Sequence, residues 1–303
     1  MYKEILVPLD GSELAEVALP YAEQLAGRLG SAVTLVHVCE SSDEKYSHMH
    51  QLYIEKMVEE VKSHAEKQLD KDKAKAVKVK SAVLTGHPAE QIVDYADSKN
   101  IGLIIMATHG WSGIRRWVLG NVAAKVARAT KRPVVLIRAK GAKPDVRKKS
   151  ILNKVLVPLD GSEESEAVLP YIEQLAPRLD SEVILLQVVA PGYFAYSVPG
   201  ETVQMYHTAE ELETLTTEAA NYLEKTADKL KEKGINAGYE VGVGAAADEI
   251  INLADKMRTD IVAMSTHGRS GISRWAFGST ADKVLHAGNT PVMLVRSPGA
   301  STG

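Results

Sequence analysis

Thr108 to Gly120 reads THGWSGIRRWVLG, and the stretch returns as Thr266 to Gly278, THGRSGISRWAFG, with nine of thirteen positions identical. In both places an apolar run precedes the stretch and an amphipathic segment follows it. This order predicts a buried strand, a glycine-bearing loop and a helix start. Glycine lets backbone N–H groups approach an anion closely, and a helix N-terminus adds unpaired N–H donors. The pattern therefore predicts a phosphate-sized loop in each half of the chain.

A second repeat shows that most of the chain is duplicated. Leu6 to Glu13, LVPLDGSE, returns unchanged as Leu156 to Glu163. The copies are 150 residues apart here and 158 residues apart at the glycine loop, so the second half has eight additional residues between its two motifs. We expect this difference in one variable region, between Glu40 and Gly86 or between their counterparts Ala190 and Gly244.

The length of the chain also suits two domains, because 303 residues exceed one ordinary compact core. Residues 139–150, AKGAKPDVRKKS, are basic and have no apolar periodicity, which is typical of a linker. We therefore expect domains over residues 1–139 and 153–298, joined by a linker over 140–152.

In the first half, short apolar runs alternate with stretches of helical periodicity. The runs predict strands at residues 5–9, 32–38, 77–84, 101–107 and 133–137. The stretches between them predict helices at residues 14–29, 52–69, 88–98 and 122–129. Pro20 should kink or restart the first helix, and the polar stretch 41–50, SSDEKYSHMH, is expected to be a mobile loop. The same order repeats in the second half, which predicts an α/β protein with two doubly wound, five-stranded parallel sheets.

In a doubly wound sheet, ligands bind beyond the carboxyl ends of the strands, where the strand order reverses. Asp10, Gly11 and Ser12 follow the first predicted strand, and the glycine loop follows the fourth. If these two strands are neighbours, the two loops face each other across one crevice.

Composition and charge exclude several classes of protein. Hydrophobic residues make up 45% and charged residues 25%, which is ordinary for a globular protein, and the net charge of −3 gives no electrostatic case for nucleic acid. No apolar run approaches the roughly 20 residues that span a bilayer, and the N-terminus MYKEILVPLDGS lacks a signal-peptide pattern. Cys39 is the only cysteine, so no disulfide can form within the chain. A cytoplasmic protein with no membrane partner is expected.

The chain resembles a tandem universal stress protein, in which two copies of that domain share one polypeptide. The resemblance covers nearly the whole chain and is carried by the LVPLDGS motif, the strand ending at His37 and Val38, and the glycine loop. The nucleotide-binding branch of this family has a signature of glycine, two residues, glycine, nine residues, glycine, then serine or threonine. The second and third glycines are present here, as Gly110 and Gly120 and as Gly268 and Gly278.

Two positions depart from this signature. The first glycine is replaced by Ala107 in one half and by Ser265 in the other, and both are small enough for the backbone to approach a ligand. The last position holds Asn121 in the first half and Ser279 in the second. A serine hydroxyl and an asparagine amide can both donate to a phosphate oxygen, but asparagine is longer. The second half is therefore the closer match.

The resemblance implies a Rossmann-like domain that binds ATP or another adenine nucleotide, with Mg²⁺ on the phosphates. Asp10 and Asp160 are expected to face the ribose or the metal, and the glycine loops to hold the phosphates. The residues expected at the two sites are Pro8, Leu9, Asp10, Val38, Met106, Ala107, Gly110, Gly120, Asn121 and Val122 in the first half, and Pro158, Leu159, Asp160, Val188, Met264, Ser265, Gly268, Gly278, Ser279 and Thr280 in the second. By charge and position, Arg115, Arg116 and Arg274 could also pair with phosphate oxygens.

Several of these residues also have a purely structural interpretation. Asp10 and Asp160 could accept only the hydrogen bonds of their own turns, and the glycines could serve only close packing. His109 and His267 are expected to stabilise their loops, because the sequence identifies no serine or cysteine partner for catalysis. Trp117 and Trp275 are expected to anchor the core.

Metal binding and other nucleotide-binding motifs are not favoured. His48 and His50, with His64 nearby, have a metal-like spacing, but a polar loop without a cysteine argues against a metal site. Cys39 is expected to be a buried small hydrophobic residue, and a redox sensor only if it is exposed. No P-loop or GxSxG motif occurs, and the glycines at 242 and 244 lack the third glycine of a dinucleotide fingerprint.

The sequence therefore predicts a stress-response protein that binds an adenine nucleotide and acts as a sensor or regulator. The alternatives are a slow metal-dependent ATPase organised by Asp10 or Asp160, and a nucleotide-free interaction module. The last strands, PVVLIR and PVMLVR, should be sheet edges that can pair with each other inside one chain. Family resemblance adds a homodimer, and the sequence does not identify a protein partner.

Overall fold

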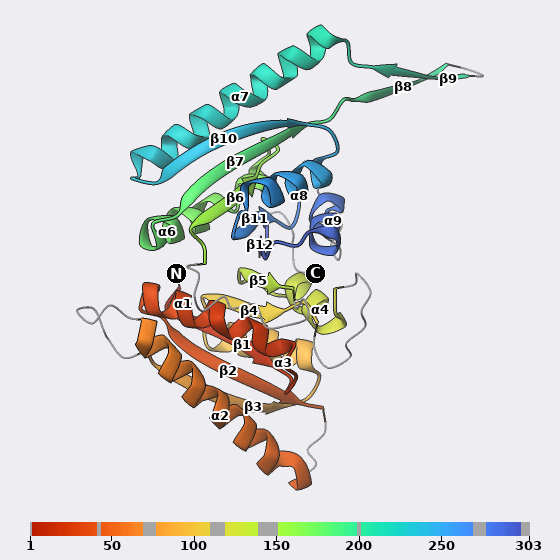
Figure 1. Ribbon diagram of the computed structural model, residues 1–303. Helices are drawn as coiled ribbons and strands as arrows, with labels where there is room; N and C mark the ends of the chain where they lie inside the picture. The colour runs from red at the N-terminus through yellow and green to blue at the C-terminus, as the bar shows by residue number, and fades with distance from the viewer. Residues whose placement is uncertain are drawn as a thin grey trace.

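The computed structural model of the chain describes residues 2–40, 44–68, 77–109, 119–138, 151–198, 201–268 and 277–297. The first half lies at the bottom of Figure 1 and the second half at the top, and each is built on a parallel sheet. In the described part of the chain, every helix is too short or too polar to cross a lipid bilayer.

The first half has five parallel strands with helices on both faces. The strands are β1 (Glu4–Leu9), β2 (Ala32–Cys39), β3 (Val79–Thr85), β4 (Leu103–Ala107) and β5 (Val134–Ile137). The helices are the 3-10 turn η1 (Ala15–Ala18), α1 (Leu19–Leu29), α2 (Glu44–Gln68), α3 (Pro88–Ser98) and α4 (Asn121–Ala129). The strand order is β3-β2-β1-β4-β5, so β1 and β4 are neighbours at the point where the order reverses.

The second half repeats this arrangement. Its sheet strands are β6 (Lys154–Pro158), β7 (Glu182–Val189), β10 (Asn236–Val243), β11 (Ile261–Ser265) and β12 (Val292–Val295), in the order β10-β7-β6-β11-β12. Its helices are α5 (Glu163–Glu166), α6 (Leu169–Leu179), α7 (Ala209–Glu232), α8 (Ala246–Met257) and α9 (Ser279–Ala287). The predicted α/β fold, with a doubly wound arrangement of five parallel strands in each half, is confirmed.

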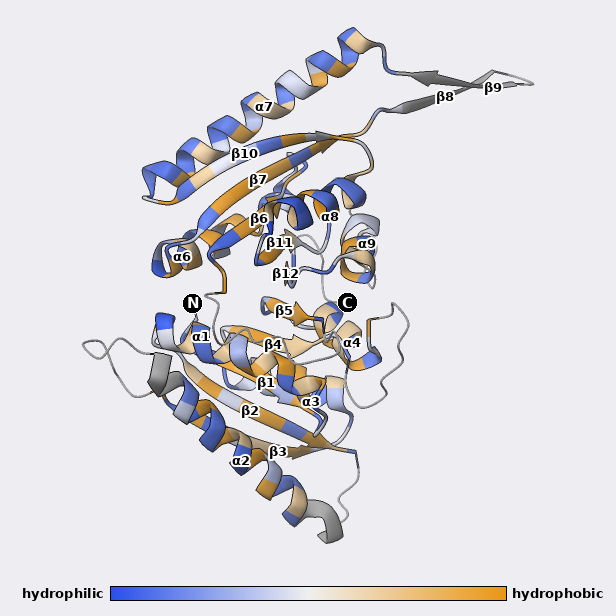
Figure 2. Ribbon diagram, viewed as in Figure 1, coloured by the Kyte–Doolittle hydropathy of each residue, from blue (hydrophilic) through white to orange (hydrophobic). Residues whose placement is uncertain are grey.

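The strands are apolar throughout because helices cover both of their faces. Ile5, Val7 and Leu9 of β1 belong to a core that includes residues of α1 and α2, whereas Leu6 belongs to a core that includes residues of α3 and α4. Figure 2 shows the same contrast in hydropathy: β1, β2 and β7 are largely hydrophobic, and the long helices α2 and α7 carry many hydrophilic residues.

The two halves join through their last strands. β12 pairs antiparallel with β5, with Met293 opposite Val135, so the strands form one ten-stranded sheet. This is the pairing within the chain that the sequence led us to expect. Because β5 and β12 now have neighbours on both sides, a second chain cannot pair with them, and the described sheet ends at β3 and β10.

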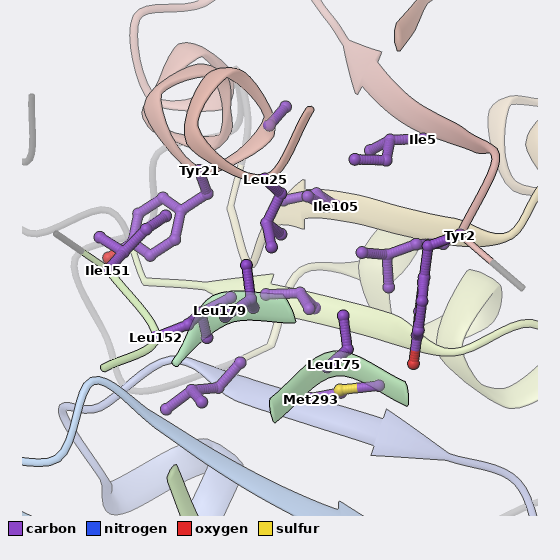
Figure 3. Packing of buried hydrophobic residues seen from close by; sticks show 14 of the residues in the cluster. Tyr2, Ile5, Tyr21, Leu25, Ile105, Ile151, Leu152, Leu175, Leu179 and Met293 are labelled. Atoms are coloured by element: carbon purple, nitrogen blue, oxygen red, sulfur yellow. The ribbon is translucent and has the colours of Figure 1, made fainter. Parts of the chain in front are cut away.

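Side chains from both halves share one core at this junction. Leu25 of α1 and Ile105 of β4 lie in the same buried cluster as Leu175 of α6 and Met293 of β12 (Figure 3). Polar contacts flank the cluster: the Gln24 side-chain oxygen accepts from the Ile151 backbone N–H at 2.9 Å. The halves are therefore packed together as well as hydrogen-bonded.

Two local features differ from, or sharpen, what the sequence predicts. The predicted first helix is divided near Pro20: the 3-10 turn η1 comes first, and Pro20 then lies in the first turn of α1. The loop expected over residues 41–50 is wrong from Glu44 onwards, because α2 begins there and runs for 25 residues. The first turns of α2 lack periodicity because they lie ahead of its first fully buried residue, Ile54.

The additional length of the second half lies between β7 and α7. Here β8 (Tyr193–Val198) and β9 (Glu201–Tyr206) form an antiparallel hairpin, whereas only residues 40–43 connect β2 to α2. The hairpin extends away from the main sheet (Figure 1).

Candidate functional site

The carboxyl ends of β1 and β4 form the edge of a cavity in the first half. The two strands pair in parallel through Ile5 and Leu103. The turn after β1 and the loop after β4 therefore lie at the same edge of the sheet, where the strands end. α4 begins at Asn121 beside them, directly after Gly120. β6, β11 and α9 repeat this arrangement in the second half, where Ile261 pairs with Val155.

The first cavity has a volume of about 420 Å³. Nine of the ten residues expected in the first half line it, and Gly110 lies outside the described residues. Its lining residues are Pro8, Leu9, Asp10, Ala15, Val36, Val38, Glu40, Pro88, Ile92, Met106, Ala107, Thr108, His109, Gly120, Asn121, Val122 and Ala123.

The second cavity has a volume of about 170 Å³, and all ten residues expected in the second half line it. Its lining residues are Pro158, Leu159, Asp160, Ser165, Leu186, Val188, Ala246, Ile250, Met264, Ser265, Thr266, His267, Gly268, Gly278, Ser279, Thr280 and Ala281. Each cavity therefore combines an apolar wall from strands and a helix with a polar rim from two loops.

The carboxylate at the rim is held by the turn that follows the first strand of each half. In the first half, Asp10 Oδ1 accepts from the backbone N–H of Ser12 at 3.0 Å and from its hydroxyl at 2.6 Å. In the second half, Asp160 Oδ1 accepts from Ser162 in the same way, at 3.0 and 2.5 Å. The turn bonds that the structural interpretation of these aspartates requires are present, and they fix the carboxylate at the mouth of the cavity.

The glycine before each helix lets two backbone segments touch. The Gly120 N–H donates to the Thr108 carbonyl at 2.8 Å, and an added Cβ would lie 2.7 Å from that same oxygen. Gly278 makes the equivalent bond to Thr266, also at 2.8 Å. Because glycine has no side chain, nothing covers the N-terminus of α4 or α9 from the N-cap position, and the first N–H groups of a helix have no partner inside it. Each cavity therefore receives a helix N-terminus.

Gly268 brings the loop after β11 against the aspartate of the second half. A Cβ at residue 268 would overlap Asp160 Oδ2. Close packing alone thus explains this glycine, and the packing also brings the loop and the carboxylate to the same place. Arg115, Arg116, Arg274, Trp117 and Trp275 lie outside the described residues.

The loop histidines bond to the threonines that precede them. His109 Nδ1 lies 3.0 Å from Thr108 Oγ1, and His267 Nδ1 lies 3.1 Å from Thr266 Oγ1. These bonds fit the loop-stabilising role expected for both histidines. The threonines and histidines also line the cavities, although the site predicted from the sequence omitted them; their identity in both copies of the loop was the available signal.

Other lining residues could not be found from the sequence. Ile92 and Pro88 of α3 line the first cavity, and Ile250 and Ala246 of α8 line the second, because α3 and α8 cover this face of the sheet. Glu40 lines only the first cavity, directly after β2. Helical periodicity predicts that the apolar residues of α3 and α8 face the sheet. It does not show which of them reach the cavity.

Comparison with known proteins agrees with this geometry. A sequence model described as the universal stress protein family matches residues 1–138 and 152–296. The chain belongs to the universal stress protein family. A universal stress protein of Methanocaldococcus jannaschii is 30% identical over 149 residues, covering 49% of this chain and 85% of the relative. A universal stress protein of Synechocystis is 23% identical over 315 residues, covering 97% of this chain and all of the relative.

A solved structure supports the tandem fold of this universal stress protein. A universal stress protein from Archaeoglobus fulgidus superposes with a TM-score of 0.71 at 18% identity, covering 98% of this chain and 99% of that one. At this level of identity the likeness is evidence for the fold alone. Any ligand must be argued from the cavities themselves.

Proposed function

We propose that this universal stress protein binds ATP or a related adenine nucleotide in the two cavities and acts as a nucleotide-dependent sensor or regulator. One observation carries the proposal: each cavity joins an apolar wall, a carboxylate fixed by its turn, and a helix N-terminus that begins directly after a glycine. A purine base suits the apolar wall, and phosphates suit the N–H groups of the helix start. The occurrence of the same three features in both halves is the support for a ligand over simple packing.

The carboxylates suit a Mg²⁺ ion on the phosphates. In each half, one oxygen of the carboxylate accepts the two hydrogen bonds of its turn, from Ser12 or from Ser162, so the carboxylate is held in place. Mg²⁺ is usually held by one or two carboxylates together with substrate phosphates. Asp10 and Asp160 would hold it here, where it would neutralise phosphate charge.

A binding protein is favoured over an ATPase. P-loop NTPases place the lysine of their GxxxxGK[ST] motif on the transferring phosphate. The sequence contains no such motif. ATP turnover well above background that disappears in Asp10→Ala and Asp160→Ala would reverse this preference.

Filling each cavity in turn tests the proposal without changing the backbone. Val38 and Val188 are half-buried and line the first and second cavities at equivalent positions. We expect two ATP sites per chain by calorimetry with Mg²⁺, one site lost in Val38→Phe, and the other lost in Val188→Phe. Each variant is the control for the other, and circular dichroism checks that both remain folded. No binding to the wild-type chain at millimolar ATP would overturn the proposal and favour the nucleotide-free interaction module.

A further inference from the structure

Three metal-ligating side chains meet on the opposite face of β2 from the first cavity. Val36 and Val38 line that cavity, so the alternating residues His37 and Cys39 lie on the other face. There α2 brings His50 against them, with the rings of His37 and His50 stacked at a centroid distance of 4.5 Å and an angle of 25°. The ligand atoms of His37, Cys39 and His50 all lie within 4.8 Å of one another.

The hydrogen bond of His37 prepares its other nitrogen for a ligand. Nδ1 lies 2.9 Å from the Leu9 carbonyl oxygen. A carbonyl can only accept, so Nδ1 carries the proton and Nε2 presents its lone pair. Metal-bound histidines typically hold their second N–H on a carbonyl or carboxylate in this way.

The second half provides an internal comparison for this cluster. Tyr53 and Glu16 pair across the first half, and Tyr222 and Glu166 pair at the equivalent place in the second, which fixes the alignment of α2 with α7. By that alignment the three clustered residues are replaced by Gln187, Val189 and Ala219. The fold is the same in both halves, so packing does not require two histidines and a cysteine here.

We propose that His37, Cys39 and His50 form a Zn²⁺ site that is present only in the first half. Two imidazoles and one thiolate are a donor set that Zn²⁺ prefers, and three protein ligands leave a fourth position for water. Nine histidines and one cysteine are distributed along the chain, and only this group of three qualifies as a metal cluster among the described residues. The site differs from the spacing of His48, His50 and His64, because two of its three ligands come from β2 and only His50 is shared.

The cluster needs only a small movement to bind the metal. Zn–N and Zn–S bonds of about 2.1 and 2.3 Å in a tetrahedral site imply ligand atoms roughly 3.6 Å apart. Cys39 and His50 are half-buried, so their side chains have room to close the difference. Zn²⁺ binds the thiolate form of Cys39, so the thiol proton is released to solvent as the Zn–S bond forms. The bound metal would tie the end of β2 to α2, next to Leu9 and the rim of the first cavity.

Metal titration of the full chain tests the site without nucleotide. The protein is dialysed against a chelator, then titrated with Zn²⁺ by calorimetry and with Co²⁺ by absorbance, which reports a cobalt–thiolate bond directly. We expect one metal ion per chain and a thiolate band with Co²⁺. No stoichiometric Zn²⁺ binding, or a Co²⁺ spectrum without the thiolate band, would overturn the proposal.

The second half supplies the residues for the variants. Cys39→Val and His50→Ala copy Val189 and Ala219, and each should weaken Zn²⁺ binding by at least the 10–100-fold that loss of an outer-shell partner costs. His48→Ala is the matched control, because His48 is exposed two residues from His50 and should bind Zn²⁺ like the wild type. Zn²⁺ should raise the thermal unfolding temperature of the wild type but not of Cys39→Val, whose metal-free unfolding temperature shows whether it folds. Unchanged affinity in the Cys39→Val, His50→Ala double variant would refute the site.

Discussion

The first cavity has a volume of about 420 Å³ and the second about 170 Å³, although the same elements build both. The sequence signature is closer in the second half, where Ser279 stands in place of Asn121. Cavity size instead favours the first half, because small-molecule sites usually exceed about 300 Å³. The fold is thus shared, while the volume of the cavity differs between the halves.

The rims differ in polarity as well as in size. Glu40 lines the first cavity, and its counterpart in sequence is Ala190. Ser165 lines the second cavity, where its hydroxyl accepts from the Asp160 N–H at 3.2 Å, and its counterpart in the first half is Ala15. Such changes leave the strands untouched, because they lie where the chain leaves the sheet. The two halves therefore differ at the rim of the cavity while they keep the same core.

The largest expected effect is at the core that joins the halves. Met293 is 2% exposed opposite Val135, whereas Met49 on α2 is 61% exposed. Met293→Ala should lower the free energy of unfolding by about 2–5 kcal/mol, and Met49→Ala by less than about 0.5 kcal/mol. Chemical denaturation followed by circular dichroism measures both.

The shape of that transition tests how separate the halves are. Because Met293 packs in a cluster with side chains of both halves, we expect a single transition that shifts as a whole. Two transitions, of which Met293→Ala moves only one, would show that the halves fold independently and that the junction is a mere contact.

A smaller effect is expected at the glycines that precede α4 and α9. An added Cβ would lie 2.7 Å from the Thr108 carbonyl oxygen at residue 120, but 3.3 Å from the Thr266 oxygen at residue 278. Gly120→Ala should therefore cost about 1–3 kcal/mol of stability and Gly278→Ala less than about 1 kcal/mol. Thermal unfolding of the pair decides this. Equal costs would mean that the two loops relax to the same geometry and that the halves differ less than their cavities suggest.

The sequence was informative where a local pattern determines the structure. The runs at 5–9 and 101–107 are apolar and repeated, and the turn and loop residues that follow them predict the residues at the cavity rim. The sequence left the adjacency of the first and fourth strands as a condition, and the structure supplies it, since β1 and β4 are neighbours. Nine residues of the first predicted site and ten of the second line the cavities for this reason.

Contacts between distant segments could not be predicted in this way. His50 meets His37 only because α2 begins at Glu44 and lies across β2 in one particular register. The polar first turns of that helix have no apolar periodicity, so the sequence predicts a loop there. His50 lies in this stretch, and its place beside His37 could therefore not be predicted. Ile92 and Glu40 line the first cavity for a similar reason. Their positions depend on how α3 and the end of β2 are placed in the fold, which the local sequence pattern does not show.

The smallest expected effect compares the tyrosines that align the two long helices. Tyr222 donates to Glu166 Oε1 at 2.7 Å, whereas Tyr53 lies 3.4 Å from Glu16 Oε1. Burial and the neighbouring carboxylate raise the pKa of both phenols, so both remain donors at neutral pH. Tyr222→Phe should cost about 1 kcal/mol and Tyr53→Phe less than about 0.5 kcal/mol, because the longer bond is weaker.

The two tyrosines also separate the metal site from the fold. Tyr53 lies edge-on to His37, with ring centroids 6.1 Å apart, so Zn²⁺ binding at His37 should change the stability lost in Tyr53→Phe. The loss in Tyr222→Phe should stay the same with or without Zn²⁺, since Gln187 is the counterpart of His37 in the second half. Denaturation of both variants with and without the metal measures this difference. If Zn²⁺ shifted both values equally, the metal would be acting on the whole sheet and not through a ligand cluster confined to the first half.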